Sequence, residues 1–146
     1  MCGIFGIISG SKNKIDPNLI DKLVSDMFYL SSKRGQEASG IGILNNNNIN
    51  ILKSGVSSSI FLKSDEYKDF IKKNTDYLLK QPQDTNNGIT IIGHTRLATN
   101  GSRIFNKNNH PIITDKSVGI HNGTITDEKI ITNKYKKEFK SKNIES

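Results

Sequence analysis

The alternation of apolar and polar positions over the first thirty residues predicts a strand followed by a helix. Residues 3–9 form a short apolar run interrupted by glycines, which is typical of a buried strand. Asp16 and Pro17 then supply a helix N-cap and a first helical residue. Beyond them, apolar residues recur at helical spacing, so we expect one helix face to pack against a sheet. These residues are Leu19, Ile20, Leu23, Val24, Met27, Phe28 and Leu30.

The middle of the chain reads as a hairpin, a helical segment and a further strand. Residues 41–44 and 49–53 are apolar runs on either side of an asparagine-rich turn at 45–48, which is typical of a β-hairpin. The apolar positions of residues 57–80 indicate a mostly helical segment. The β-branched residues at 89–92 predict another buried strand, which continues into a polar motif.

The remaining segments are more polar and carry weaker signals. Residues 81–88 and 99–109 read as loops, and residues 118–121 read as a short strand. The segment 134–146 is strongly charged and has no clear apolar stripe. Because no repeat or linker divides the chain, we expect one α+β domain over residues 1–146.

The net charge raises the question of nucleic-acid binding. The 146 residues carry a formal charge of +7, and 34% of them are hydrophobic, which suits a globular protein on the polar side. The lysines are scattered from Lys12 to Lys142, and no ladder of aromatic residues accompanies them. The excess of positive charge therefore does not predict a nucleic-acid partner.

The single cysteine and the absence of a long apolar run narrow the chemistry further. One cysteine forms no internal disulfide and fits a reducing compartment. The N-terminal apolar run is too short for a signal peptide or a membrane span, so we expect a cytoplasmic protein without membrane contact. One cysteine and three scattered histidines do not make a zinc site of the usual kind, and we expect no metal.

The position of Cys2 directly after Met1 is a candidate chemical feature. Removal of Met1 would give Cys2 a free α-amino group beside its thiol, and a neutral amine can act as the base for a neighbouring nucleophile. The alternative interpretation is a small apolar residue that packs in the core.

Four polar clusters lie at strand ends or in the loops that follow them, at residues 2–3, 34–37, 93–101 and 121–123. Functional residues are often placed in this way by a rigid scaffold.

Two of these clusters contain groups that suit a thiol nucleophile acting on an amide. The side chain of Asn122 and the backbone N–H of Gly123 supply two donors for an oxyanion, and Arg96 suits a substrate carboxylate better than a lysine does. Taken singly, Asn-Gly is also a common hairpin turn, and an arginine at a strand end is often a surface ion pair.

With these residues the chain resembles the class II glutamine amidotransferases, a branch of the N-terminal-nucleophile hydrolases, over residues 1–133. The resemblance rests on four motifs in the family's order. They are MCGIFG at 1–6, RGQEASGI at 34–41, GHTRLATNG at 93–101 and HNG at 121–123. The family implies a four-layer αββα sandwich, of which this chain would form a part.

The resemblance implies roles for individual residues around the nucleophile. Cys2 would attack the glutamine side-chain amide, and its α-amino group would be the general base. Asn122 and Gly123 would form the oxyanion hole, and Arg34 would brace the site around Cys2. Ammonia would leave, and water would hydrolyse the thioester to glutamate without a cofactor.

The resemblance also implies a substrate pocket and partners. Arg96 would bind the glutamine carboxylate, with Thr99 and Asn100 lining the same pocket. The ammonia would pass to an acceptor domain or subunit. The histidines are expected to be structural. They are His94, His110 and His121.

The chain departs from the family pattern at its C-terminal end. The family's acidic segment, whose Asp binds the substrate amine, has no confident counterpart here, and the later strands of the sandwich are not found. We therefore expect a truncated domain with an exposed apolar sheet face, and an inactive remnant with a binding role is the alternative. RGQE resembles amidophosphoribosyltransferases, whereas residues 94–99 with 109–111 favour the fructose-6-phosphate aminotransferase branch.

Overall fold

A computed structural model describes residues 1–10, 16–45, 48–79, 88–99, 101–114 and 117–135. The strands are β1 (Gly3–Ser9), β2 (Ala38–Asn45), β3 (Asn48–Ser54), β4 (Ile89–Arg96), β5 (Ile112–Ile113) and β6 (Val118–Gly119). The helices are α1 (Pro17–Ser32), α2 (Ser58–Phe61), α3 (Asp65–Thr75) and α4 (Glu128–Lys134), with two short 3-10 helices, η1 (Asp76–Leu79) and η2 (Asn106–Asn108). The mixed composition of the fold agrees with the α+β prediction.

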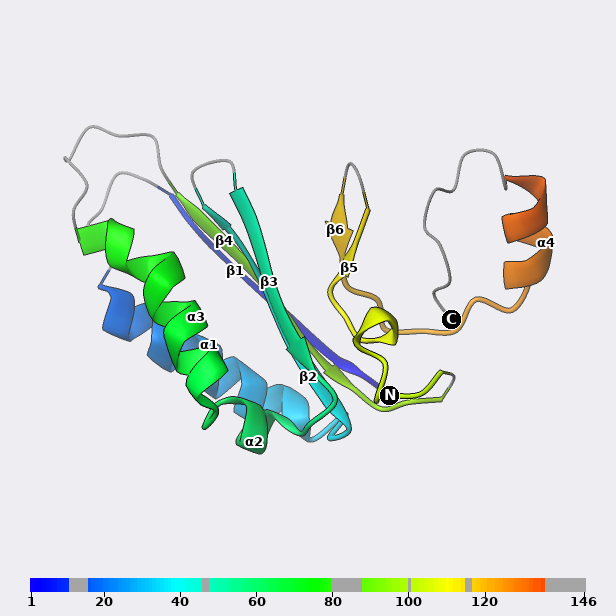
Figure 1. The fold of residues 1–146 in the computed structure, drawn as a ribbon, viewed down its shortest axis with the longest axis horizontal. Helices are drawn as coiled ribbons and strands as arrows, with labels where there is room; N and C mark the ends of the chain where they lie inside the picture. The colour runs from blue at the N-terminus through cyan, green and yellow to red at the C-terminus, as the bar shows by residue number, and fades with distance from the viewer. Residues whose placement is uncertain (11–15, 46–47, 80–87, 100, 115–116, 136–146) are drawn as a thin grey trace.

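The main sheet has the strand order β1-β4-β2-β3, and every neighbouring pair is antiparallel. Helices α1, α2 and α3 lie on one side of it, and the β5–β6 hairpin lies on the other (Figure 1). Residues directly opposite each other in neighbouring strands place their side chains on the same face of the sheet, so the strand register shows which residues lie on the face of the site. One row on the face away from the helices contains Ile4, His94, Gly40 and Lys53.

A series of aromatic rings forms the core between the sheet and the helices. The ring centroids of Phe5 and Phe28 are 4.9 Å apart in an edge-to-face contact, and Phe28 lies 5.5 Å from Phe61. The ring centroid of Tyr67 lies 5.4 Å from that of Phe61, and Tyr67 is buried. Its hydroxyl donates a hydrogen bond of 2.9 Å to Asp21, so the polar end of the ring is satisfied. This core fixes the orientation of α1 on the sheet.

The start of α1 follows the sequence prediction. The side chain of Asp16 accepts a hydrogen bond of 2.9 Å from the backbone N–H of Asn18, and Pro17 is the first helical residue. A cap of this kind satisfies one of the backbone donors that a helix N-terminus otherwise leaves free.

The buried stripe of α1 is narrower than predicted. Ile20, Val24 and Phe28, spaced by four residues, are at most 2% exposed. The prediction that the whole apolar set packs in the core is wrong for three leucines, because they lie on the flanks of the helix facing away from the sheet. These are Leu19, Leu23 and Leu30, which are 50%, 36% and 56% exposed.

The segment predicted as mostly helical over 57–80 is divided into α2, α3 and η1. The division falls before Ser64, whose hydroxyl accepts a hydrogen bond from the backbone N–H of Tyr67 at 3.2 Å and so caps a new helix. Phe61 and Ile71 are buried on either side of this break.

Several predicted boundaries in the site-bearing half were wrong. Strand β4 continues to Arg96, so residues 93–96 lie within the sheet and not in a loop. Residues 118–121 form a strand only at Val118–Gly119, and the partner strand Ile112–Ile113 was not predicted. Helix α4 was not predicted, and the charged segment beyond it, 136–146, lies outside the described residues.

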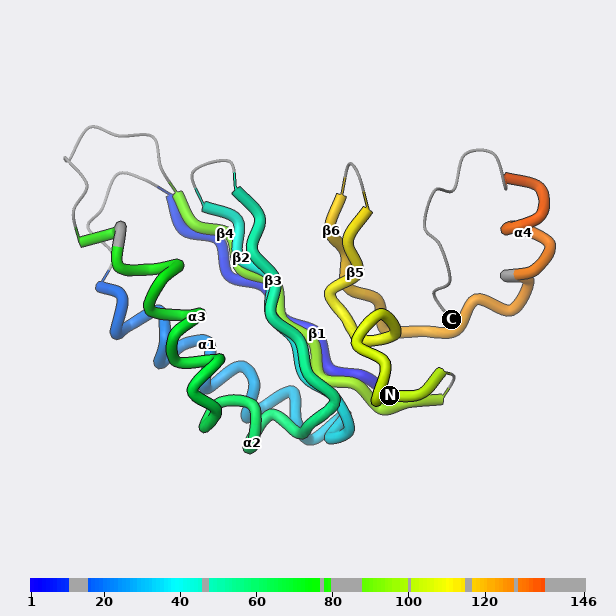
Figure 2. Tube along the Cα trace, in the orientation of Figure 1, coloured from blue at the N-terminus to red at the C-terminus, as the bar shows by residue number. Residues whose placement is uncertain are grey.

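A second layer covers part of the outer face of the main sheet. Residues 101–113 pass close to the N-terminal end of β1 and then form β5 (Figure 2). Gly40 allows this approach, because a Cβ atom there would collide with the backbone oxygen of His110. The two-stranded β5–β6 sheet is compatible with a partial N-terminal-nucleophile fold, and the four-layer sandwich stays a prediction.

The far end of the same face is uncovered, as the sequence predicted. Ile8, Leu44 and Ile49 lie in one row with Thr90. These three apolar side chains are 82%, 41% and 46% exposed. In the described parts of the chain, no helix is long and apolar enough to span a membrane.

Candidate functional site

Cys2 lies immediately before β1, where the register brings it beside the last residue of β4. Gly3 pairs with Thr95, so the preceding residue lies next to Arg96 on the outer face of the sheet. A Cβ atom on Gly3 would approach Ser31 O and the hydroxyl of Thr95 to 2.6 Å, which requires glycine here. Cys2 is half-buried, and its Sγ lies 3.7 Å from the carbonyl oxygen of Leu97. The thiol therefore faces the loop that follows β4, and it is not part of the core.

Arg34 lies on the other side of the N-terminus. Its Nε donates a hydrogen bond of 3.2 Å to the carbonyl oxygen of Cys2, and its Nη2 lies 3.8 Å from the sulfur of Met1. Met1 and Arg34 line an open hollow together with Gln36 and Glu37. The bracing role predicted for Arg34 stays a prediction, but the side chain is in direct contact with the Cys2 backbone.

Glu37 joins this loop to the loop after β4. Its backbone N–H donates to Arg96 O at 3.0 Å, and its carboxylate accepts a hydrogen bond from the N–H of Ala98. Gly35 makes the contact possible, since a Cβ atom there would lie 2.5 Å from the backbone of Arg96. The RGQE and HTRLAT motifs are thus one connected unit.

Arg96 is 6% exposed and belongs to the wall of a cavity. Its Nη1 donates to the side-chain oxygen of Asn109 at 2.9 Å, and its Nη2 donates to the carbonyl oxygen of Gly101 at 3.0 Å. Gly101 has a positive φ of 71°, a conformation that glycine adopts without strain. The guanidinium is held by acceptors from two loop positions.

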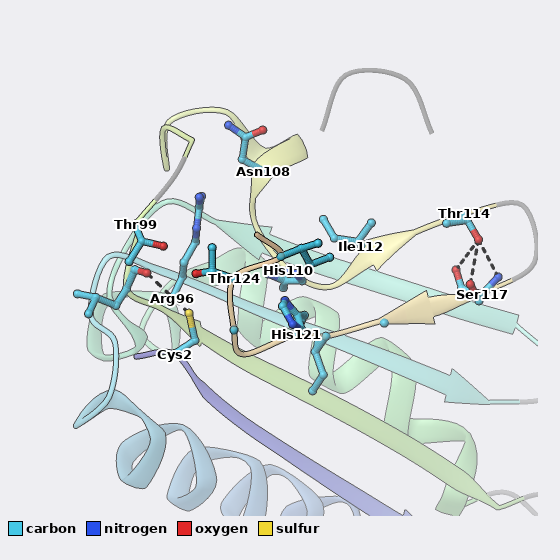
Figure 3. Close-up of a pocket in the computed structure, with 15 residues that line it drawn as sticks. Cys2, Arg96, Thr99, Asn108, His110, Ile112, Thr114, Ser117, His121 and Thr124 are labelled. Carbon is cyan, nitrogen blue, oxygen red and sulfur yellow. Dashed lines mark hydrogen bonds between the residues drawn. The ribbon is translucent and has the colours of Figure 1, made fainter. Parts of the chain in front are cut away.

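A cavity of about 370 Å³ lies between the end of the main sheet and the β5–β6 hairpin. Cys2, Arg96, Thr99 and Thr124 gather at one end of it (Figure 3). Thr114, at the other end, is hydrogen-bonded to Ser117. A thiol, a guanidinium and a hydroxyl therefore share one concave surface, as binding sites for small polar molecules do.

Two histidines lie at the floor of the cavity: His94 is buried, and His110 is half-buried and lines the cavity. The rings of His94 and His110 are 4.4 Å apart, and His94 Nε2 lies 3.1 Å from the carbonyl oxygen of His121. Because a carbonyl accepts hydrogen bonds, Nε2 carries the proton of His94. Burial is the main reason why the pKa of both rings is lowered to about 4, and the nearby positive charge of Arg96 contributes in the same direction. Both imidazoles are neutral at pH 7.

The bond from His94 connects the sheet to the oxyanion motif. His121 precedes Asn122 and Gly123, so its carbonyl anchors the predicted oxyanion segment to β4. Gly123 lines the cavity. Asn122 is half-buried and is not among the described residues that line it.

The structure thus brings together part of the predicted site. Cys2, Arg96, Thr99 and Gly123 line one cavity, and Arg34 contacts Cys2 from outside it. Asn100 lies outside the described residues. The roles assigned to these residues stay predictions.

Sequence reasoning missed three residues that organise the site. Glu37 stands in a motif that was recognised, but only Arg34 was given a role there. Asn109 anchors Arg96, and Lys53 Nζ donates to the carbonyl oxygens of Asn109 and Pro111 at 2.7 and 3.0 Å. Burial lowers the pKa of Lys53. Glycine at alternate positions 40 and 42 of β2 was the available signal, because it marks close approach of another backbone.

The described residues contain no group of three or more His, Cys, Asp or Glu side chains placed to hold a metal ion.

Comparison with known proteins gives a consistent set of relatives. The chain is 32% identical to the glutamine–fructose-6-phosphate aminotransferase of Sulfolobus acidocaldarius over 131 residues, which is 88% of the chain. It is 30% identical to the enzyme of that name from Wigglesworthia glossinidia brevipalpis over 145 residues, which is 97% of the chain. The corresponding protein of Caldanaerobacter subterraneus is 33% identical over 127 residues.

The chain is a homologue of these aminotransferases. Their N-terminal domain is a class II glutamine amidotransferase, so the resemblance drawn from the four motifs is confirmed, and so is the preference for the fructose-6-phosphate branch. The chain spans about a fifth of the length of these relatives, with 19%, 20% and 17% of each covered. No family model matches the chain, and no solved structure matches it significantly.

Proposed function

We propose that the chain hydrolyses the side-chain amide of glutamine, with Cys2 as the nucleophile. The observation that carries the proposal is the shared cavity, in which the Cys2 thiol and the Arg96 guanidinium face the same space. A guanidinium is suited to a planar carboxylate, and a thiol is suited to attack on a carbonyl carbon. Glutamine carries both a carboxylate and an amide carbonyl. The relatives are named for glutamine as a substrate.

Activation of the thiol requires removal of Met1. While Met1 is present, the nitrogen of Cys2 belongs to a peptide bond and is not basic. After removal, the free amine takes the thiol proton, and the sulfur attacks the side-chain carbonyl carbon of glutamine. Arg34 keeps its contact with the carbonyl oxygen of Cys2 through this change, so the residue stays at the head of β1.

The tetrahedral intermediate places a negative charge on the former carbonyl oxygen. The N–H of Gly123, which lines the cavity, is the proposed donor for this charge; the Asn122 side chain is the proposed second donor and must turn into the cavity when substrate binds. His94 holds their segment through the His121 carbonyl. Collapse of the intermediate breaks the C–N bond, and the amine of Cys2 returns the proton to the departing ammonia. Water then attacks the thioester, which releases glutamate and restores the thiol.

The ammonia is proposed to pass to an acceptor domain or subunit. The names of the relatives specify fructose-6-phosphate as the acceptor substrate of those proteins. The chain would contribute the glutamine-hydrolysing half of such a transfer.

Glutamate release from glutamine tests the proposal. The mature chain should release glutamate, and Cys2→Ala should lower the rate by at least about a thousandfold, as loss of a nucleophile does in comparable sites. Insertion of one Gly between Met1 and Cys2 keeps the thiol but removes its amine, and it should lower the rate to a similar extent. Intact mass establishes that Met1 is absent from the active protein.

Equal glutamate release from the parent chain and from Cys2→Ala would overturn the assignment of the nucleophile. No release by a chain that lacks Met1 would favour the inactive remnant instead.

A further inference from the structure

We propose that Asn109 is a positioning residue for the substrate: it holds the Arg96 guanidinium in the cavity wall so that the guanidinium meets the α-carboxylate of glutamine. The inference rests on the proposed function, because it takes Arg96 as the carboxylate-binding group. It adds a residue that belongs to none of the four motifs.

Arg96 needs such a partner because its side chain is long and buried. A buried arginine gives up rotamer freedom and must satisfy its N–H groups with acceptors. The side-chain oxygen of Asn109 accepts from Nη1 at 2.9 Å, and the backbone oxygen of Gly101 accepts from Nη2 at 3.0 Å. Asn109 is thus the side-chain anchor of the guanidinium in this pair of contacts.

The amide of Asn109 is itself locked in orientation. Asn109 is 1% exposed, and its Nδ2 donates to Arg103 O at 2.8 Å and to the side-chain oxygen of Asn106 at 3.2 Å. These two acceptors point the NH₂ group away from Arg96 and turn the oxygen toward it. A flipped amide would place donors against donors.

The backbone of Asn109 is tied to the main sheet as well. Its carbonyl oxygen accepts a hydrogen bond from Lys53 Nζ at 2.7 Å, and Lys53 belongs to β3. Its N–H donates to Asn106 O at 3.1 Å. The backbone of Asn109 is therefore held by two separate elements. Its side chain in turn restricts the position of the Arg96 guanidinium.

The choice of an amide at this position has a chemical consequence. A neutral acceptor orients the guanidinium without neutralising its charge, whereas a carboxylate in the same place would compete with the substrate carboxylate. An Asn109→Asp variant would keep the side-chain shape and the Nη1 contact, would lose the two hydrogen bonds that Nδ2 donates, and would weaken substrate binding. A purely structural role for Asn109 predicts no such effect.

Steady-state glutaminase kinetics on the mature chain test the inference with three variants. Asn109→Ala should raise KM for glutamine roughly tenfold to a hundredfold, the range expected for a lost hydrogen bond to a charged group, while kcat falls less than about threefold. Asn109→Asp should raise KM comparably, and it should also lower Tm, because a carboxylate oxygen would then face the acceptors Arg103 O and Asn106 Oδ1. Asn74→Ala is the matched control, because Asn74 is also a buried asparagine with a side-chain bond to a backbone oxygen, but it lies in α3 on the helix side of the sheet.

A second substrate separates positioning from general damage. The analogue 4-aminobutanamide lacks the α-carboxylate, so its kcat/KM should be the same for the parent chain and for Asn109→Ala.

Two results overturn the inference while leaving the proposed function intact. One is a KM for glutamine that is unchanged in both Asn109 variants although it rises in the Arg96→Ala variant. The other is an equal loss on both substrates. Absence of glutamine hydrolysis by the parent chain would overturn the proposed function and this inference with it.

Discussion

At the scale of single residues, the site depends on glycines that let backbone segments approach one another. Because Gly3 has no side chain, the backbone of α1 can lie close to the strand beside Cys2. Gly35 in the same way allows close approach of the backbone of Arg96. Gly40 admits His110, which brings the Asn109 anchor over the sheet. These contacts position the nucleophile and the guanidinium without themselves taking part in chemistry.

Gly40→Ala should destabilise the fold and disturb the cavity, because the added Cβ collides with a backbone oxygen that cannot rotate away. We expect a loss of about 1–3 kcal/mol in the free energy of unfolding, typical of overpacking. Urea unfolding measures it. Gly6→Ala is the control, since its Cβ would meet only Ile91 O at 3.6 Å. Equal stability of the two variants would contradict the close packing of residues 108–111 on β2.

The sequence predicted the reactive residues better than their supports. Cys2, Arg96 and Gly123 belong to short motifs with chemical meaning, and they were found from those motifs. The bond between Asn109 and Arg96 was not predictable, because an asparagine in a polar loop gives no sign of what it contacts. Side chains that act through tertiary contacts lack a local pattern.

At the scale of elements, strand β4 contributes side chains both to the packing against the helices and to the site on the opposite face. Ile91 and Thr95 face the helices, whereas His94 and Arg96 lie on the opposite face, where Arg96 lines the cavity and His94 contacts His110 and the carbonyl oxygen of His121. The central position of β4 between β1 and β2 fixes all four side chains. The sequence prediction ended this strand at residue 92, because the motif that follows is polar. In the structure the polar side chains of this motif are buried and hydrogen-bonded, so the strand continues to Arg96.

Stability should fall as the pH drops from 7 to 5, because His94 and His110 resist protonation in the folded state. Their pKa is lowered to about 4 from an unfolded value of about 6.5, so the unfolded chain binds more protons across this interval. Arg96, near both rings, and Lys53, near His110, are the positive charges around the pair. We expect a loss of about 2–4 kcal/mol for the pair in urea unfolding.

The variant with both His94→Asn and His110→Asn should show a flatter profile over the same interval. An unchanged slope would show that other groups dominate the pH dependence.

At the scale of the whole molecule, the main sheet is covered by helices on one face and only partly covered on the other (Figure 1). The α+β class and the exposed sheet face were predicted from the sequence. The second sheet was not, because two-residue strands such as Ile112–Ile113 are too short to show a period of two. Only their contacts with the rest of the chain define them.

The uncovered apolar row should promote self-association of the chain. Ile8 is 82% exposed in that row, so Ile8→Lys removes apolar surface without disturbing the core. We expect this variant to stay monomeric at concentrations where the parent chain associates, as measured by sedimentation velocity. Ile104→Lys adds the same charge at an equally exposed site, 81%, away from the sheet. If both variants suppress association equally, net charge and not the sheet face is responsible.

The central claim is that Cys2 is a nucleophile in a glutamine site, and covalent labelling tests it most directly. A diazoketone analogue of glutamine, incubated with the chain that lacks Met1, should add its mass to the peptide that begins at Cys2. Excess glutamine should protect Cys2, and Arg96→Ala should slow the labelling by roughly a hundredfold, as expected for a lost charged hydrogen bond. Labelling that is absent from Cys2, or that glutamine does not prevent, would contradict the account.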